Sequence, residues 1–382
     1  MVGENDEDVD DEEASVQLDE DWVVVQSLLP PGWEDAARQT GALRRERGFA
    51  GPGALLRVLL MHLVDGCSLR ETAARAQAGG LAQVSDVALL KRLRGCGEWF
   101  CWMAEQISQH LSSASGEVIA GRRVRLVDAT VVCEPGATGS TWRLHYMIDL
   151  TTLACEQVEV TSPEDGESLT RFEVKRGDVL MADRGLAHRR GIRHVVDRGG
   201  DVVVRTNLSN IPLESPHGGE FKLLPRLRKL GVGRAAAWPA VLSVDRATVA
   251  VRVCAIKKGA EQTRNEHKRI RRRASKKGIE TKQETLEMAG YVVVLTTLKD
   301  VAPEVILELY RYRWQIELAF KRLKSLLQLG HLKKTDPMGA RAWLQGKIFV
   351  AALIELLIAT GERFSPWGYL QPGSRPTPLP MA

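Results

Sequence analysis

Residues 179–185, VLMADRG, form a short apolar segment that ends in a carboxylate and a glycine turn. Four apolar residues bounded by turn residues are typical of a buried strand. Residues 124–128, VRLVD, form a second short strand that ends in Asp128, as the first ends in Asp183. If the two strands are parallel neighbours, both carboxylates lie at one edge of a sheet. That edge is where open α/β sheets place their functional sites.

The elements around these two strands predict a mixed α/β fold. Strands are expected at 124–127, 142–150, 152–161, 179–182 and 201–205, and helices at 167–175 and 188–196. The strands at 142–150 and 152–161 are expected to be antiparallel, and the later alternation of strand and helix makes the sheet mixed. Residues 206–299 interrupt this pattern. Four further strands are expected there, at 221–230, 235–244, 248–256 and 291–298.

Residues 22–118 are predicted to be helical. Ser68 and Glu71 have the spacing of a capping box, and Ser85 can cap a further helix that exposes basic residues at 91–94. A helix, a glycine turn and a basic helix fit a helix-turn-helix. A plain helical bundle would have the same pattern, so both interpretations remain open.

Charge is distributed unevenly along the 382 residues. Residues 1–21 hold eleven acids and no Lys or Arg, so the net charge of +5 leaves +16 on the rest of the chain. A basic body with an acidic tail suits a nucleic-acid binder, and the tail has too little apolar content to fold. Residues 257–282 hold eleven Lys or Arg and three acids. We expect this basic helix or loop to contact phosphate, although a solvated surface is the alternative.

The six cysteines include no C-x-x-C pair, which argues against a zinc site and a disulfide framework and favours a reducing compartment. The acidic N-terminus does not resemble a signal peptide. The apolar run at 348–359 contains Glu355 and is too short to cross a bilayer, so it predicts a buried helix. We therefore expect a cytoplasmic, nucleoid-associated protein with no membrane partner.

Four chemically active side chains recur along one predicted helix over residues 303–330: Tyr310, Arg313, Glu317 and Lys324. At about 100° per residue, their spacings of three, four and seven place all four within about 60° of one another. The apolar residues that border this stripe are Leu307, Leu309, Trp314, Ile316, Leu318 and Phe320. One acid among three groups able to bind phosphate predicts metal chemistry beside a polyanion.

Asp128, Asp183 and Glu317 are the candidate catalytic and metal-binding residues. Three carboxylates from three separate elements provide the hard oxygen ligands that suit Mg²⁺. Two such ions can activate a water or a 3′-hydroxyl and stabilise the leaving oxygen in phosphoryl transfer. Taken singly, each aspartate could be a turn residue, and Glu317 could pair with Arg313 or Lys321. Their combination with the stripe favours the functional interpretation.

The chain resembles the bacterial insertion-sequence transposases of the DDE type. The late motif of that family is Tyr, two residues, Arg, three residues, Glu, six residues and Lys, which matches the stripe at 310–324. The first acidic motif resembles Asp128-Ala129-Thr130, followed by Pro135-Gly136 and residues 142–146. The second resembles residues 182–185. The resemblance covers about residues 55–370.

The resemblance implies an RNase H-like catalytic core with a β-rich insertion and a helical N-terminal domain. It implies a cut-and-paste enzyme in which Asp128, Asp183 and Glu317 bind two Mg²⁺ ions, with Mn²⁺ as a substitute. The enzyme would cleave one strand at each transposon end, and the freed 3′-hydroxyl would form a hairpin or attack target DNA. The implied DNA-binding residues are Tyr310, Arg313, Lys321, Lys324 and Trp238, the last as a stacking platform for a flipped base. The implied partners are double-stranded terminal inverted repeats, target DNA and a second protomer in the DNA complex.

These expectations divide the chain into six parts. The parts are an acidic tail (1–21), a helical DNA-binding domain (22–118), the first part of the core (119–205), the β-rich insertion (206–299), the last core helices (300–350) and a C-terminal segment (351–382). The proline-rich end departs from the family pattern and suggests a truncated terminus. Two alternatives therefore stay open: a defective remnant that binds DNA without pairing two ends, and a DNA-binding protein whose core is only structural.

Overall fold

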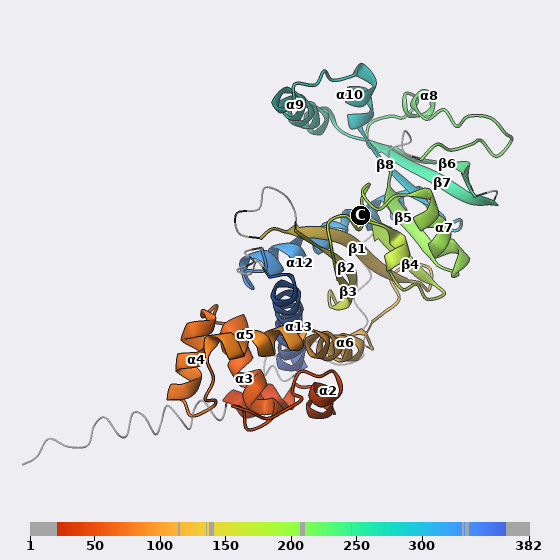
Figure 1. Cartoon of the computed structure of the whole chain (residues 1–382). Coiled ribbons are helices and arrows are strands. Elements are labelled where there is room, and N and C mark those ends of the chain that lie inside the picture. Colours follow the sequence, from red (N-terminus) through yellow and green to blue (C-terminus); the bar gives the residue numbers. More distant parts are fainter. Residues whose placement is uncertain are drawn as a thin grey trace, which may run out of the picture. The chain divides into compact units, whose positions relative to one another are not determined.

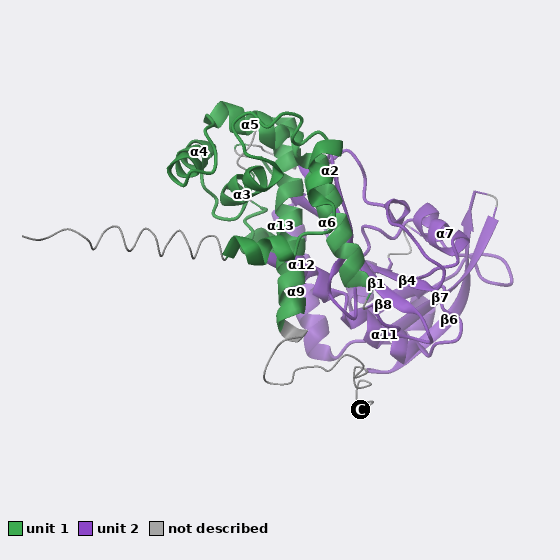
Figure 2. Ribbon diagram, turned by 90° about the horizontal axis from the view of Figure 1, so that it is seen from below, with its two compact units in different colours: residues 1–113, 132–140, 323–382 green, residues 114–131, 141–322 purple. Residues whose placement is uncertain are grey.

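The computed structural model describes residues 21–113, 115–134, 136, 141–206, 211–245, 247–330, 332 and 336–363. The chain forms two compact units (Figure 2). Unit 1 comprises residues 1–113, 132–140 and 323–382, and unit 2 comprises 114–131 and 141–322. Residues 323–350 thus group with the N-terminal helices, whereas the sequence analysis placed them in the core. The six predicted domain boundaries themselves stay a prediction.

Unit 2 is built on one eight-stranded sheet with the order β3-β2-β1-β4-β5-β8-β7-β6 (Figure 1). The strands are β1 (Arg123–Val132), β2 (Trp142–Asp149), β3 (Cys155–Thr161), β4 (Asp178–Ala182), β5 (Asp201–Arg205), β6 (Ala235–Val244), β7 (Ala247–Lys257) and β8 (Tyr291–Thr296). β1 pairs in parallel with β4, and β2 pairs antiparallel with β3, as predicted. The mixed α/β fold class is confirmed.

The strands expected within residues 206–299 belong to the same sheet. β8 pairs antiparallel with β5, and β7 lies between β8 and β6. The strand predicted at 221–230 is wrong, because this segment contains only the short helix α8 (Leu224–Leu227). Pro225 has no N–H to donate to a strand ladder, but it is suited to the first turn of a helix.

Besides α8, the helices described in unit 2 are α7 (Arg189–Asp197), α9 (Ala260–Lys276), α10 (Gln283–Ala289), α11 (Pro303–Arg311) and most of α12 (Trp314–Ser325). α11 packs on β5, β6, β7 and β8. The helix predicted at 167–175 is wrong in extent: only a 3-10 turn, Leu169–Arg171, forms there. Leu169 is fully buried and packs against Gly191 of α7, which fixes this segment against the core.

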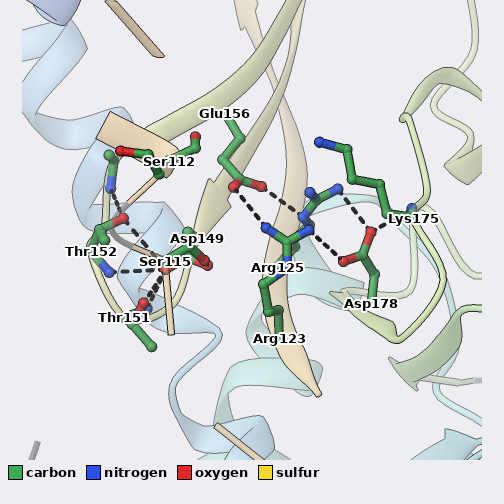
Figure 3. Close-up of polar contacts among 12 residues, drawn as sticks. Ser112, Ser115, Arg123, Arg125, Asp149, Thr151, Thr152, Glu156, Lys175 and Asp178 are labelled. Atoms are coloured by element: carbon green, nitrogen blue, oxygen red, sulfur yellow. Dashed lines mark hydrogen bonds and ion pairs between the residues drawn. The ribbon is translucent and has the colours of Figure 1, made fainter. Parts of the chain in front are cut away.

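A buried ionic network ties the start of β1 to β4 and β3 (Figure 3). Arg125 contacts Glu156 at 2.7 Å and Asp178 at 3.0 Å, and at most 5% of each of the three side chains is exposed. Arg123 also reaches Asp178, at 3.0 Å. Because Arg123 is the residue paired with Asp178 across the two strands, this network favours one register of β1 against β4.

Unit 1 is helical in its described part. It contains α2 (Trp33–Gln39), α3 (Pro52–Leu63), α4 (Leu69–Ala78), α5 (Asp86–Gly95), α6 (Gly97–Ser112) and α13 (Pro337–Arg363). Ser68 accepts a hydrogen bond from the N–H of Glu71, and Ser85 accepts one from Ala88, so both predicted caps are confirmed. The choice between helix-turn-helix and plain bundle stays open.

Helix α13 is long and apolar enough, by length and composition alone, to cross a membrane over residues 337–361. It packs on α6, where the Phe100 and Phe349 rings stack with centroids 5.8 Å apart, and 61% of its apolar window is buried. Within the apolar run at 348–359, residues 348–353 are buried as predicted, whereas Ile354, Leu357 and Ile358 are exposed.

Candidate active site

Asp128 and Asp183 lie side by side at one sheet edge. Val127 pairs with Ala182 across the parallel strands β1 and β4. Asp128 directly follows Val127, and Asp183 directly follows Ala182. The shared register therefore brings both side chains to the same side of the sheet. One detail differs from the prediction: β1 continues to Val132, and it is β4 that ends here. Asp128 is thus the first residue of β1 beyond its parallel partner.

The long helix predicted over residues 303–330 is interrupted, so the four residues do not share one straight stripe. α11 ends at Arg311 and α12 begins at Trp314, with Tyr312 and Arg313 between them. The N–H of Arg313 bonds to the C=O of Tyr310, three residues back. Such i−3 bonds tighten a helix terminus and mark a break in the regular ladder. Tyr310 therefore lies on α11 and Glu317 on α12.

Arg313 joins the acids of different elements from its position in this break. Its Nη1 lies 3.7 Å from Oδ2 of Asp128, and its Nη2 donates a hydrogen bond to Oε1 of Glu317. Only 13% of the Arg313 side chain is exposed, whereas 59% of Glu317 is exposed. The pairing of Glu317 with Arg313, one of the two pairings that the sequence left open, is confirmed. Arg313 therefore contacts acids on β1 and on α12.

The carboxylates at this edge influence one another. Burial raises the pKa of Asp128 to about 6, while the N–H of Ala129 and the Arg313 guanidinium lower it and the neighbouring Asp183 and Glu167 raise it. An acid with a raised pKa among other acids is typical of a site that binds a cation or a proton.

Two buried polar atoms beside the acids have no hydrogen-bond partner among the described residues: Oδ1 of Asp183 and the hydroxyl of Tyr310. Burial and the Asp183 carboxylate raise the pKa of the Tyr310 phenol, so the side chain keeps its proton. A buried acceptor and a buried donor without partners are costly unless a ligand satisfies them.

The donor chemistry at this edge fits a hard divalent cation. The free Oδ1 of Asp183 and the crowded carboxylate of Asp128 are suitable ligands. As the side chains stand, however, no three described His, Cys, Asp or Glu groups are close enough to hold one ion. The Glu317 carboxylate accepts a hydrogen bond from Arg313 in this arrangement.

Glu167 is a site residue that the sequence analysis missed. A Cβ at Gly185 would lie 2.6 Å from its Oε2, so the carboxylate occupies space that any other residue at 185 would fill. Gly185 has no positive φ, so its backbone does not require glycine. Oε1 of Glu167 lies 3.8 Å from Nε of Arg143 on β2. The turn after β4 and strand β2 therefore position this fourth acid, whose charge raises the pKa of Asp128.

The other predicted DNA-binding residues lie on α12 and on β6. Lys321 is exposed on α12. Lys324 is half-buried near the end of α12, in unit 1, where its stem packs against Gly330. Trp238 is half-buried in edge strand β6 and packs against the core of unit 2. Pro135 and the proline-rich end after residue 363 lie outside the described residues.

Known proteins resemble this chain over most of its length. Residues 119–353 match the family described as "Transposase DDE domain". The "Putative transposase InsL for insertion sequence element IS186A" of Escherichia coli (strain K12) is 35% identical over 88% of this chain and 93% of its own length. The "Transposase for insertion sequence element IS421" of Escherichia coli is also 35% identical, over 88% and 93%. The "Transposase for insertion sequence element IS231F" of Bacillus thuringiensis subsp. israelensis is 21% identical over 85% and 77%. The chain belongs to the DDE transposase family of bacterial insertion sequences, whose catalytic domain is RNase H-like.

Proposed function

We propose that this chain is a DNA transposase that cleaves one strand at each end of an insertion sequence and joins the freed 3′-hydroxyl to target DNA. Asp128, Asp183 and Glu317 are the proposed catalytic residues. The family membership supports the activity. The observation that carries the assignment is the placement of both aspartates one residue beyond the Val127–Ala182 pair, with Arg313 contacting both Asp128 and Glu317.

Use of a divalent metal follows from the family in general terms. We assign two Mg²⁺ ions to this edge, with Mn²⁺ as a substitute. Asp128 and Asp183 would hold them, and Glu317 would complete the set by exchanging its pairing with Arg313 for the cation. Bound there, the ions would lower the pKa of an attacking water or 3′-hydroxyl and neutralise charge on the leaving oxygen.

The chain's own residues would position the phosphate. Arg313 is pre-oriented by its two carboxylate contacts, and its planar fork suits a phosphate oxygen pair. The Tyr310 hydroxyl keeps its proton and lacks a partner, so it can donate to a further phosphate oxygen. Such donors stabilise charge without reorganising during the reaction.

The partners that we infer are the double-stranded inverted repeats at the element's ends, target DNA and a second protomer in the DNA complex. Lys321 and Lys324 are assigned to DNA phosphates. Trp238 is assigned to stack a flipped base, although its packing against the core also fits a structural role. A protein that acts on chromosomal DNA is expected with the nucleoid in the cytoplasm.

The test is cleavage of the DNA that flanks this chain's coding sequence. End-labelled duplexes would be incubated with protein and Mg²⁺, and the strands resolved under denaturing conditions. We expect nicks at the inverted-repeat boundary that disappear in Asp183→Asn and Glu317→Gln, whereas both variants still shift the duplex in a gel. Glu308→Gln is the matched control, because Glu308 is an exposed acid on α11 that pairs only with Arg311 among the described residues. Equal cleavage by wild type and Glu317→Gln would remove Glu317 from the site.

A further inference from the structure

Helix α9 presents most of its surface to solvent. None of its seventeen residues is buried. One side packs toward α10, where Nε2 of His267 lies 2.7 Å from the C=O of Leu286 and Thr263 lies against Gly290 (Figure 1). A helix held on one side by α10 leaves its other faces for a partner.

Those faces carry two basic stripes of identical spacing. The inner stripe consists of Arg269, Arg273 and Lys276, and the outer stripe of Arg264, Lys268 and Arg271. In each, the residues are four and then three apart, so each stripe spans about 60° on the helix. Corresponding residues of the two stripes are five positions apart, which separates the stripes by about 140°.

The inner stripe begins beside a cationic group that leads to the catalytic edge. Arg269 contacts Glu266 at 3.0 Å, and Nζ of Lys258 lies 4.0 Å from the same carboxylate. Burial lowers the pKa of Lys258, Glu266 raises it, and the positive charges of Arg205, Arg269 and Arg184 lower it further. Arg184 follows Asp183 directly in the chain. Positive side chains therefore extend from Arg184, next to Asp183, to Arg269 on α9.

Negative charge does not balance this group. Lys258 and Arg269 share the single carboxylate of Glu266, and only 12% of Lys258 is exposed. The buried Nε of Arg205 has no hydrogen-bond partner in the described part of the chain. Arg273 and Lys276, farther along α9, form no ion pair with any residue that the structure describes. Clustered cations with too few acids are costly unless an anion binds them.

We propose that Lys258 and the inner stripe of α9 bind the sugar–phosphate backbone of the duplex that is cleaved at Asp183. The stripe from Arg269 to Lys276 extends about 10 Å along the helix, since the rise is about 1.5 Å per residue. That length matches about three nucleotide steps of one strand at about 3.4 Å each. The outer stripe faces away from this group and makes no such contact. The inference rests on the proposed function, because it takes the DNA at Asp183 as the ligand.

The test compares two triple variants of the full chain. The inner variant is Arg269→Gln, Arg273→Gln and Lys276→Gln, and the outer variant is Arg264→Gln, Lys268→Gln and Arg271→Gln. Both remove three charges from the same exposed helix, and Gln has nearly the helix propensity of Lys and Arg. Circular dichroism confirms the fold of each. Binding to the flanking-DNA duplex is then measured at several salt concentrations between 50 and 200 mM.

Each phosphate contact contributes about 0.9 to the slope of log affinity against log salt. We expect the salt slope of the inner variant to be shallower than that of wild type by between two and three. The ratio of wild-type affinity to inner-variant affinity then falls by about 40-fold as salt rises from about 50 to 200 mM. The outer variant is expected to lose less than one unit. Equal slopes for both variants would overturn the inference. Wild-type cleavage in the same preparation separates that result from failure of the proposed function, in which wild type itself would not cleave.

Discussion

Replacing Asp178 by Ala tests whether the buried ionic network holds β1 and β4 in register. The Asp178 side chain is 1% exposed. Its carboxylate oxygens lie 3.0 Å from Nη1 of Arg125, 3.0 Å from Nη2 of Arg123 and 2.6 Å from the backbone N of Lys175. Removing one partner of a buried pair leaves an uncompensated charge, which costs about 3–5 kcal/mol. The loss falls on the strands that carry Asp128 and Asp183, so we expect it to destabilise the site as well.

The assay is hydrogen exchange, measured by mass spectrometry in increasing urea on peptides that cover β1 and β4. With a slope of about 3 kcal/mol per molar urea, the expected loss moves the midpoint for these peptides down by roughly 1–1.7 M. Asp197→Ala is the control, because Asp197 pairs with Arg193 on the surface of α7 at 2.7 Å with half its side chain exposed. A pair of this kind contributes about 0–1 kcal/mol.

If Asp178→Ala moves the β1 and β4 midpoints no further than Asp197→Ala does, the network does not stabilise this strand pair. A substantial shift confined to α7 peptides would be equally damaging, because Asp178 makes its contacts with β1 and with the segment before β4.

Four further substitutions examine the site and its surroundings. Gly185→Ala places a Cβ 2.6 Å from Oε2 of Glu167, so we expect unchanged folding by circular dichroism and cleavage slowed by about 10- to 100-fold; wild-type cleavage would show that the position of Glu167 is irrelevant. Burial lowers the pKa of His145 to about 4 from its ordinary value near 6.5. The part of the folding stability that depends on neutral His145 is therefore fully present above pH 6.5 and is lost as pH falls toward 4. His145→Gln should abolish that loss, which amounts to at most about 3 kcal/mol, and urea titrations at pH 7 and pH 4.5 that show the same acid sensitivity in both proteins would contradict it. Arg313→Ala should slow cleavage by about 100-fold, because it removes a donor held between two acids. Lys324→Ala should mainly weaken binding of the duplex. Equal single-turnover rates for Arg313→Ala and wild type, measured at saturating protein, would exclude a role of Arg313 in cleavage.

The apolar segments 124–127 and 179–182, each followed by an aspartate, pointed to β1 and β4 and raised their parallel pairing as a condition, although β1 continues through Asp128 to Val132. The same local patterns identified β6, β7 and β8 as strands. They could not show that β8 joins β5, because this pairing connects residues about ninety positions apart and depends on the whole sheet. Residues 206–299, which were predicted to interrupt the core, therefore contribute three strands to its sheet.

The helix break between Arg311 and Trp314 had no signal in the sequence, since no glycine or proline lies there. The straight helix predicted over residues 303–330 is wrong in geometry, although the spacing selected Arg313 and Glu317, which do contact each other. Two residues four positions apart can meet whether or not the preceding turn is regular. Glu167 was missed because a single acid before a 3-10 turn has no periodic pattern, and only the missing Cβ at Gly185 reveals its place.

The break also explains how one arginine can serve acids on different elements. In an uninterrupted helix, Arg313 would continue the face of Tyr310, which is buried against the sheet. In the break, its guanidinium reaches Asp128 on β1 while its other nitrogen donates to Glu317 on α12. The contact to Glu317 lies within a single turn of chain and can be exchanged by a change of side-chain rotamer, whereas the contact to Asp128 depends on the sheet register set by Val127 and Ala182. Binding of a divalent cation is therefore expected to release Glu317 first and to leave Arg313 at the sheet edge, where it can hold a phosphate.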